Sequence, residues 1–249
     1  MKISSWTKKL SSALLAAGIW VPSAVFARDI PLGDASFEDA VVPAAIGYSY
    51  SSTYRPTSAW VDDADMAGQD DGSSNWLYDA AYAETNPDRL RPAPRTGNQA
   101  MHGIGYYSGQ ETGAVFESGM VYKFSVWAQG DSDSTDSSSR VWLYIYDGSV
   151  PFSEPNSLTF ARYAPDTGDF VNRAPGSSAA ESQASWTQIT ISHRVEPGAP
   201  EIGQPVGVAF WGAGDGAVDD ASLAAVVPEP TTVILAGMGG LLLLGRRRD

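Results

Sequence analysis

The chain has 249 residues, a formal net charge of −13 and no cysteine. This charge argues against nucleic acid, which is bound through Lys and Arg at its phosphates, and against anionic lipid surfaces. It favours solubility and the binding of divalent cations. Without cysteine the protein has no disulfides, no thiol nucleophile, no Cys-ligated zinc and no iron–sulfur cluster. Its core must therefore hold it together unaided, or with the help of a metal ion.

The first 27 residues have the pattern of a secretory signal peptide. Three lysines lie within the first ten residues, and residues 11–27 are uncharged and mostly apolar. Val25 and Ala27 fit the small-residue pattern that precedes a cleavage site. We therefore predict cleavage after Ala27 and export of the mature protein.

Residues 28–224 are predicted to form one domain of β-strands. Apolar and polar residues alternate with a period of two in the segments 121–129, 140–148, 186–195 and 204–213, and a further strand is expected at 158–164. Clusters of Gly, Pro, Ser and Asp separate these segments, as in the turns of all-β proteins. The pattern predicts an all-β fold, an antiparallel β-sandwich.

The segment 140–148 carries candidate ligand-binding residues. Val141, Leu143 and Ile145 form its more apolar face, which the sheet should bury. The opposite face carries Trp142, Tyr144 and Tyr146. Sugars stack on aromatic rings, so this stripe is a carbohydrate platform if it faces solvent, and part of the core if it faces a second sheet. Two further candidates, Trp60 and Trp76, are expected in loops that rim such a site.

Catalytic motifs are weak in this sequence. His102 and His193 do not stand in a metal-binding spacing, and no G-x-S-x-G elbow or phosphate-binding glycine loop occurs. Acidic residues are so numerous that carboxylate pairs suited to glycoside hydrolysis arise by chance. We therefore predict a non-catalytic binding or structural role, with a secreted polysaccharide hydrolase as the alternative.

The tail at 225–249 combines three elements. A Pro-Glu-Pro motif is followed by the uncharged run 231–245 and by three arginines. The run is slightly shorter than the roughly 17 to 20 residues of a membrane helix, and snorkelling arginines can extend it on the cytoplasmic side. The alternative is a buried helix of the folded domain, but a soluble helix would show polar residues at a period of about 3.6. We predict a transmembrane-like helix over 231–245.

This three-part pattern resembles the PEP-CTERM sorting signal of exported bacterial proteins. The matching residues are Pro228, Glu229, Pro230, Arg246, Arg247 and Arg248. The resemblance implies that an exosortase, a membrane-embedded processing enzyme, recognises the tail and cuts near the motif. It also implies export through the inner membrane, transient anchoring there, and release to the cell surface or extracellular matrix. Bacteria with such proteins typically make extracellular polysaccharide, so exopolysaccharide is the expected partner.

The order of motifs in the central domain is similar to that of galactose-binding-like jelly rolls, the fold of many carbohydrate-binding modules. The motifs are DASFEDA at 34–40, Trp60, residues 91–105, the strands at 118–129 and 186–195, and AVDDASL at 217–223. First and last strands can be neighbours in an open antiparallel sandwich, which would bring Glu38 close to Asp220. The resemblance implies a structural calcium ion at Glu38 and Asp220, with Asp219 as a further ligand. The alternative is that these acids lie in solvent at strand ends.

Overall fold

The computed structural model describes residues 27–38, 48–50, 59–62, 76–79, 91–102, 107–132, 139–150, 152, 156–213 and 216–228. The signal peptide up to residue 26, the helix expected at 231–245, and the motif residues Glu229, Pro230, Arg246, Arg247 and Arg248 lie outside this set. No helix within it is long and apolar enough to cross a membrane.

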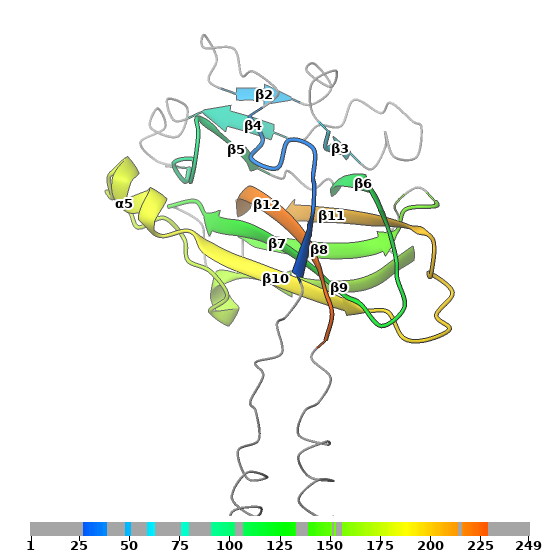
Figure 1. Cartoon of the computed structure of the whole chain (residues 1–249). Helices are drawn as coiled ribbons and strands as arrows, with labels where there is room; N and C mark the ends of the chain where they lie inside the picture. Colours follow the sequence, from blue (N-terminus) through cyan, green and yellow to red (C-terminus); the bar gives the residue numbers. More distant parts are fainter. Residues whose placement is uncertain are drawn as a thin grey trace, which may run out of the picture. The chain divides into compact units, whose positions relative to one another are not determined.

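The described strands form two antiparallel sheets (Figure 1). The seven-stranded sheet has the order β10 (Thr187–Arg194), β7 (Val121–Gly130), β12 (Gly216–Val226), β5 (Gln99–His102), β4 (Trp76–Asp79), β2 (Tyr48–Tyr50), and β1 (Ala27–Ile30) also pairs with β12. The five-stranded sheet has the order β3 (Val61–Asp62), β6 (Tyr107–Val115), β11 (Pro205–Ala213), β8 (Arg140–Asp147), β9 (Ser157–Tyr163). Two short helices are described, η3 (Pro165–Thr167) and α5 (Ala179–Ala184). The predicted all-β sandwich, with a strand at β9, is confirmed.

The core lies between the two sheets and follows the alternation of the strands. Every second residue of a strand points to the same side, so one apolar row per strand enters the core. The buried rows are Tyr122, Phe124 and Val126 on β7, Val141, Leu143 and Ile145 on β8, Ile189 and Ile191 on β10, and Val206, Val208 and Phe210 on β11. Burial of such rows supplies about 25 cal/mol per Å² of apolar surface and is the main stabilising contribution.

Trp60 belongs to this core. It is 2% exposed, and its ring centroid lies 5.1 Å from that of Phe210 and 5.5 Å from that of Phe37. Its indole nitrogen donates to the carbonyl of Asp34 at 3.0 Å, which allows the whole side chain to be buried. The prediction that Trp60 rims a ligand site is therefore wrong. Trp76 begins β4 and so does not lie in a loop, and its side chain lies outside the described set.

The first and last strands are neighbours, as predicted. β1 pairs with the end of β12, with Ala27 opposite Val226 and Ile30 opposite Leu223. Figure 1 shows β1 in blue beside β12 in orange. Both chain ends therefore leave the sandwich at one place.

The outer face of the seven-stranded sheet is covered by residues 91–98, named here the roof, together with α5. Trp186 on this face is 5% exposed, and its indole nitrogen donates to the carbonyl of Ala93 at 2.9 Å. The hydroxyl of Tyr78 donates to the carbonyl of Pro92 at 2.9 Å. From α5, the hydroxyl of Ser182 accepts a hydrogen bond from the backbone N–H of Ala93 at 3.0 Å. The aromatic residues of this face therefore serve to hold the roof.

Candidate functional site

The outer face of the five-stranded sheet carries a layer of aromatic side chains, named here the aromatic face. Its members are Tyr107 on β6, Trp142, Tyr144 and Tyr146 on β8, Trp211 on β11, Phe160 on β9, and Phe152 in the connection between β8 and β9. The strand members point outward because they alternate with the core residues. Pairing then aligns them across strands, with Trp211 opposite both Tyr107 and Trp142.

One half of the aromatic face is closed by Phe152. Small residues at outward positions of β11, Gly207 and Ala209, leave a hollow beside the tyrosines of β8. A Cβ on Gly207 would lie 2.3 Å from the ring of Tyr146, so that ring lies directly on the glycine. The ring centroid of Phe152 lies 4.9 Å from that of Tyr146 and 5.3 Å from that of Tyr144. Both tyrosines are 1% exposed, so their assignment as candidate ligand-binding residues is wrong.

Burial also sets the ionisation of Tyr146. Desolvation, with a smaller contribution from the nearby carboxylate of Glu111, raises the pKa of Tyr146 far above its ordinary value of 10.0. The phenol therefore stays neutral at all physiological pH values. This half of the face acts as a second, smaller core.

The other half of the aromatic face is open and is centred on two indoles. The ring centroids of Trp142 and Trp211 lie 4.2 Å apart, with the ring planes tilted by 43°. Both side chains are only partly buried. Tyr107 extends the surface, with its centroid 5.8 Å from that of Trp211, and Phe160 is 57% exposed. We name Trp142 and Trp211 the indole pair.

Hydrogen-bond donors adjoin the indole pair. Arg162 lies opposite Trp142 in the β8–β9 ladder, and its guanidinium carbon lies 6.0 Å from the ring centroid. Arg162 also pairs with Asp166 at 3.3 Å. Arg140 precedes Trp142 by two residues on the same strand face, and its buried Nε has no hydrogen-bond partner in the described part of the chain. The buried indole nitrogen of Trp211 equally lacks one there.

Unpartnered buried donors cost free energy, so a ligand that accepts hydrogen bonds gains only if it reaches them. Sequence reasoning singled out Trp142 but did not identify Arg140 or Arg162. Both arginines stand at positions that alternate with core residues on β8 and β9, in register with the indole pair. The nearness of these arginines to the indole pair can be recognised only once the strand pairing is known.

The three predicted metal ligands gather around one end of the roof. The Oε1 atom of Glu38 accepts hydrogen bonds from the backbone N–H groups of residues 98 and 99, at 2.8 and 2.7 Å. The Oδ2 atom of Asp219 accepts from the backbone N–H groups of residues 95 and 96, at 2.8 and 3.2 Å. Asp220 pairs with the side chain of Arg95. The acids of the first and last segments therefore clamp the same stretch of chain.

This clamp does not present an open set of cation ligands. Calcium takes six to eight oxygen ligands, whereas N–H donors and the Arg95 guanidinium contact the carboxylates here. In the ranges that the structure describes, no three His, Asp or Glu side chains form a group that could hold a metal ion. Burial, and next the charge of Asp220, raise the pKa of Asp219 to about 8. Calcium binding at Glu38, Asp219 and Asp220 stays a prediction.

His193 joins the edges of the two sheets. Its Nδ1 atom lies 2.9 Å from the hydroxyl of Thr159 on β9, and its Nε2 atom lies 3.1 Å from a carboxylate oxygen of Glu201. Hydroxyl, imidazole and carboxylate are the components of a catalytic triad. Here, however, Thr159 pairs with the core residue Ile145 and His193 pairs with the core residue Tyr122, so both belong to the inner faces of the strands. The arrangement is a bridge between sheets and is separate from the aromatic face.

The comparison with protein families confirms the tail. Residues 226–248 match the PEP-CTERM protein-sorting motif, the signal predicted from Pro228, the glutamate and proline after it, and the terminal arginines. No curated protein matches the chain.

Solved structures that are similar to the chain include two cyclases, which share its fold, and more distantly a carbohydrate-binding module. A cyclase from Fischerella sp. TAU is similar at 15% identity and a TM-score of 0.53, over 80% of this chain and 98% of that one. The Stig cyclase Fisc from the same organism is similar at 16% identity and a TM-score of 0.52, with the same coverage. TmCBM61, solved with beta-1,4-galactotriose, is similar at 12% identity and a TM-score of 0.38, over 79% of this chain and 97% of that one. The chain thus combines a jelly-roll β-sandwich with a PEP-CTERM sorting tail.

Proposed function

We propose that the chain is an exported, non-catalytic protein that binds exopolysaccharide through the open half of its aromatic face. Its tail holds it in the inner membrane until an exosortase processes it, and the mature protein then acts at the cell surface or in the extracellular matrix. The observation that carries the binding role is the partly exposed indole pair, Trp142 and Trp211. The match of residues 226–248 to the sorting motif supports the route.

The chemistry of the indole pair suits a sugar. One face of a pyranose ring presents C–H groups, which pack on an indole, and its edge presents hydroxyls, which accept hydrogen bonds. The guanidinium of Arg162, beside Trp142, supplies donors at that edge. Arg162 and the indole pair stand on strands, so little ordering is needed when a ligand binds.

The acids of the aromatic face support a binding role over hydrolysis. Asp166 is paired with Arg162, and Glu111 acts electrostatically on the buried Tyr146. Glycoside hydrolysis requires two carboxyl groups on either side of the scissile bond. Asp166 is engaged by Arg162, and Glu111 lies opposite Gly207, beside the closed half of the face.

Binding is tested with the full chain in detergent micelles, on a glycan array and on exopolysaccharide purified from the producing bacterium. We expect retention without sugar release, and a loss of affinity of about tenfold in Trp142→Ala, equivalent to about 1.4 kcal/mol of stacking. Trp142→Phe keeps an apolar ring and should lose less. Val171→Ser, at an exposed valine elsewhere on the domain, is the matched control. Equal retention by Trp142→Ala contradicts the site, and released sugar supports the hydrolase instead.

We also propose that calcium binds Glu38, Asp219 and Asp220 by replacing the N–H donors and the Arg95 guanidinium that contact these carboxylates. The support is the convergence of these acids from the first and last segments on residues 95–99. A ligand present at 100 times its Kd stabilises the folded state by about 2.7 kcal/mol. We expect calcium to raise the Tm, chelator to reverse the rise, and Glu38→Gln to abolish it. A Tm indifferent to calcium and to chelator rules the site out.

A further inference from the structure

We infer that the end of the sandwich from which both terminal segments leave is a contact surface for lipid headgroups. We name it the exit end, and define it by the start of β1, the end of β12, and the loops 115–121, 147–150 and 195–204. The inference rests on the proposed function, because it takes residues 231–245 to be inserted in the bilayer.

The exit end is one continuous surface. Its three loops are joined by backbone hydrogen bonds, from Gly203 to Phe116 at 2.9 Å, from Gly119 to Val195 at 2.8 Å, and from Gly148 to Pro205 at 2.9 Å. The loops connect strands of both sheets, so they close the sandwich on this side. Such a cross-linked end can meet a flat surface without rearrangement.

The length of the connecting chain places this end at the bilayer. Only residues 227–230 separate the end of β12 at Val226 from the uncharged run. An extended chain spans at most about 3.6 Å per residue, so these five steps reach about 18 Å. Roughly 5 to 8 Å of that distance is the headgroup layer itself. A tether this short prevents the domain from turning its opposite end to the membrane.

The side chains of the exit end suit that position. Four of the large apolar residues that are most exposed in the described part of the domain stand here: Val115 at 43%, Val150 at 44%, Ile202 at 38% and Val227 at 44%. Side chains of this kind insert into the boundary between headgroups and acyl chains. The apolar surface is therefore concentrated where the tether brings the domain to lipid.

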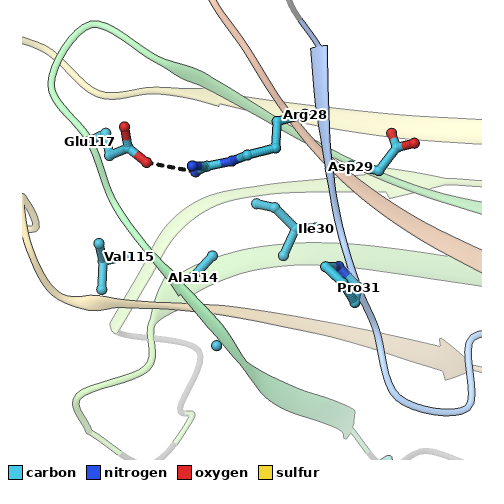
Figure 2. A pocket seen from close by; sticks show the side chains of 8 residues that line it. Arg28, Asp29, Ile30, Pro31, Ala114, Val115 and Glu117 are labelled. Carbon is cyan, nitrogen blue, oxygen red and sulfur yellow. Dashed lines mark hydrogen bonds and ion pairs between the residues drawn. The ribbon is translucent and has the colours of Figure 1, made fainter.

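Two of the acids at the exit end are paired with arginines, while Asp147 and Glu201 add further negative charge. Arg28 pairs with Glu117 at 2.6 Å, and Arg194 pairs with Glu196 at 3.1 Å. Figure 2 shows the first pair beside a pocket of about 460 Å³ that is lined in part by Ile30 and Val115. The two ion pairs remove part of the repulsion that an acidic domain meets at a bilayer containing anionic lipid.

The contact surface can be tested by site-specific labelling, because the chain has no cysteine and a single introduced cysteine is the only residue that a thiol-reactive fluorophore will label. The chain with its tail is reconstituted in phosphatidylcholine vesicles, with and without doxyl-labelled lipid, and carries an environment-sensitive fluorophore at Ile202→Cys. We expect a blue-shifted emission and strong quenching by the doxyl lipid. The matched control is Val171→Cys, at a residue that is 49% exposed and bonded through its carbonyl to Gly130, at the opposite end of β7. The control label should not be quenched.

A third label separates this inference from the proposed function. At Leu242→Cys, within the uncharged run, quenching reports insertion of the tail itself. If the label at residue 242 is quenched but the labels at residues 202 and 171 are quenched equally weakly, the contact surface is contradicted and the sorting role is not. No quenching at 242 overturns the membrane-held tail. Val150→Asp in the Ile202→Cys chain should reduce quenching at 202 without changing the Tm, and unchanged quenching contradicts the role of the apolar side chains.

Discussion

The two outer faces of the sandwich both carry tryptophans, but in different states. Trp186, on the seven-stranded sheet, is 5% exposed under the roof and donates its indole N–H to the carbonyl of Ala93. Trp211, on the five-stranded sheet, is partly exposed, and its N–H has no partner in the part of the molecule described. An indole whose N–H is bonded within the protein is a structural element. An indole whose ring stays partly exposed is available to a ligand.

The largest expected difference between the two faces is in the stability lost when a whole indole is removed. Trp186→Ala should lower the free energy of unfolding by about 3–5 kcal/mol, because it opens a cavity under the roof. Trp142→Ala on the open face should cost about 1 kcal/mol, as is typical of partly exposed positions. Urea unfolding of both variants measures the difference. Equal costs would mean that the aromatic face is as structural as the roofed one.

The roofed face should also be the pH-sensitive one. Burial and Asp220 raise the folded-state pKa of Asp219 from 3.8 to about 8. Between these values the folded state holds a proton that the unfolded state has released, so stability falls as the pH rises from about 4 to about 8. Asp219→Asn should show a flatter dependence across this window. The measurement is urea unfolding at several pH values, and a slope of the opposite sign contradicts the pKa shift.

Two glycines test how tightly the closed half of the aromatic face is packed. Gly207→Ala should destabilise the domain by about 1–3 kcal/mol, because the new methyl group would meet the ring of Tyr146 at 2.3 Å. Gly113→Ala is the control, since its methyl group would meet nothing within 4 Å. The Tm of each variant reports the effect. A neutral Gly207→Ala would show that the hollow is loosely filled.

The smallest expected effect comes from replacing each tryptophan by phenylalanine. This change tests the contribution of the indole N–H while an aromatic ring is kept. Trp186→Phe should cost about 1 kcal/mol, since it leaves the carbonyl of Ala93 without its donor. Trp211→Phe removes an N–H that has no protein partner and should cost less, while weakening sugar binding. Stability and binding are measured on the same two variants. A reversed order of stabilities contradicts the assignment of the two faces.

Alternation predicted which side of a strand enters the core, but not what covers its other side. Val141, Leu143 and Ile145 are buried as predicted, because their environment follows from the period of the strand. Tyr144 is buried by Phe152, and Trp186 by the roof, which lies about 90 residues away in sequence. Such coverage depends on the path of loops, which local periodicity does not contain.

Local chemistry did hold one readable signal that strand periodicity misses. Helix α5 begins with a capping box: the side chain of Ser178 accepts a hydrogen bond from the backbone N–H of Glu181, and the Glu181 carboxylate accepts one from the backbone N–H of Ser178.

The approach of the first and last segments was predicted from the sequence, because the first and last strands were expected to be neighbours. Glu38 and Asp220, the acids of these two segments, both contact the roof. Arg95 was missed because nothing in its local sequence indicates a partner so distant along the chain.

The position of β12 in its sheet has a consequence for folding during export. β12 pairs with β7 on one side and with β5 and β1 on the other, yet it is the last strand of the domain. The middle of the sheet thus stays empty until residue 226 has emerged, and pairings so distant in sequence close slowly. Until then the unpaired edges of β7 and β1 are exposed to aggregation. On the proposed route, the tail that follows β12 would tether each chain to the membrane while this last strand pairs.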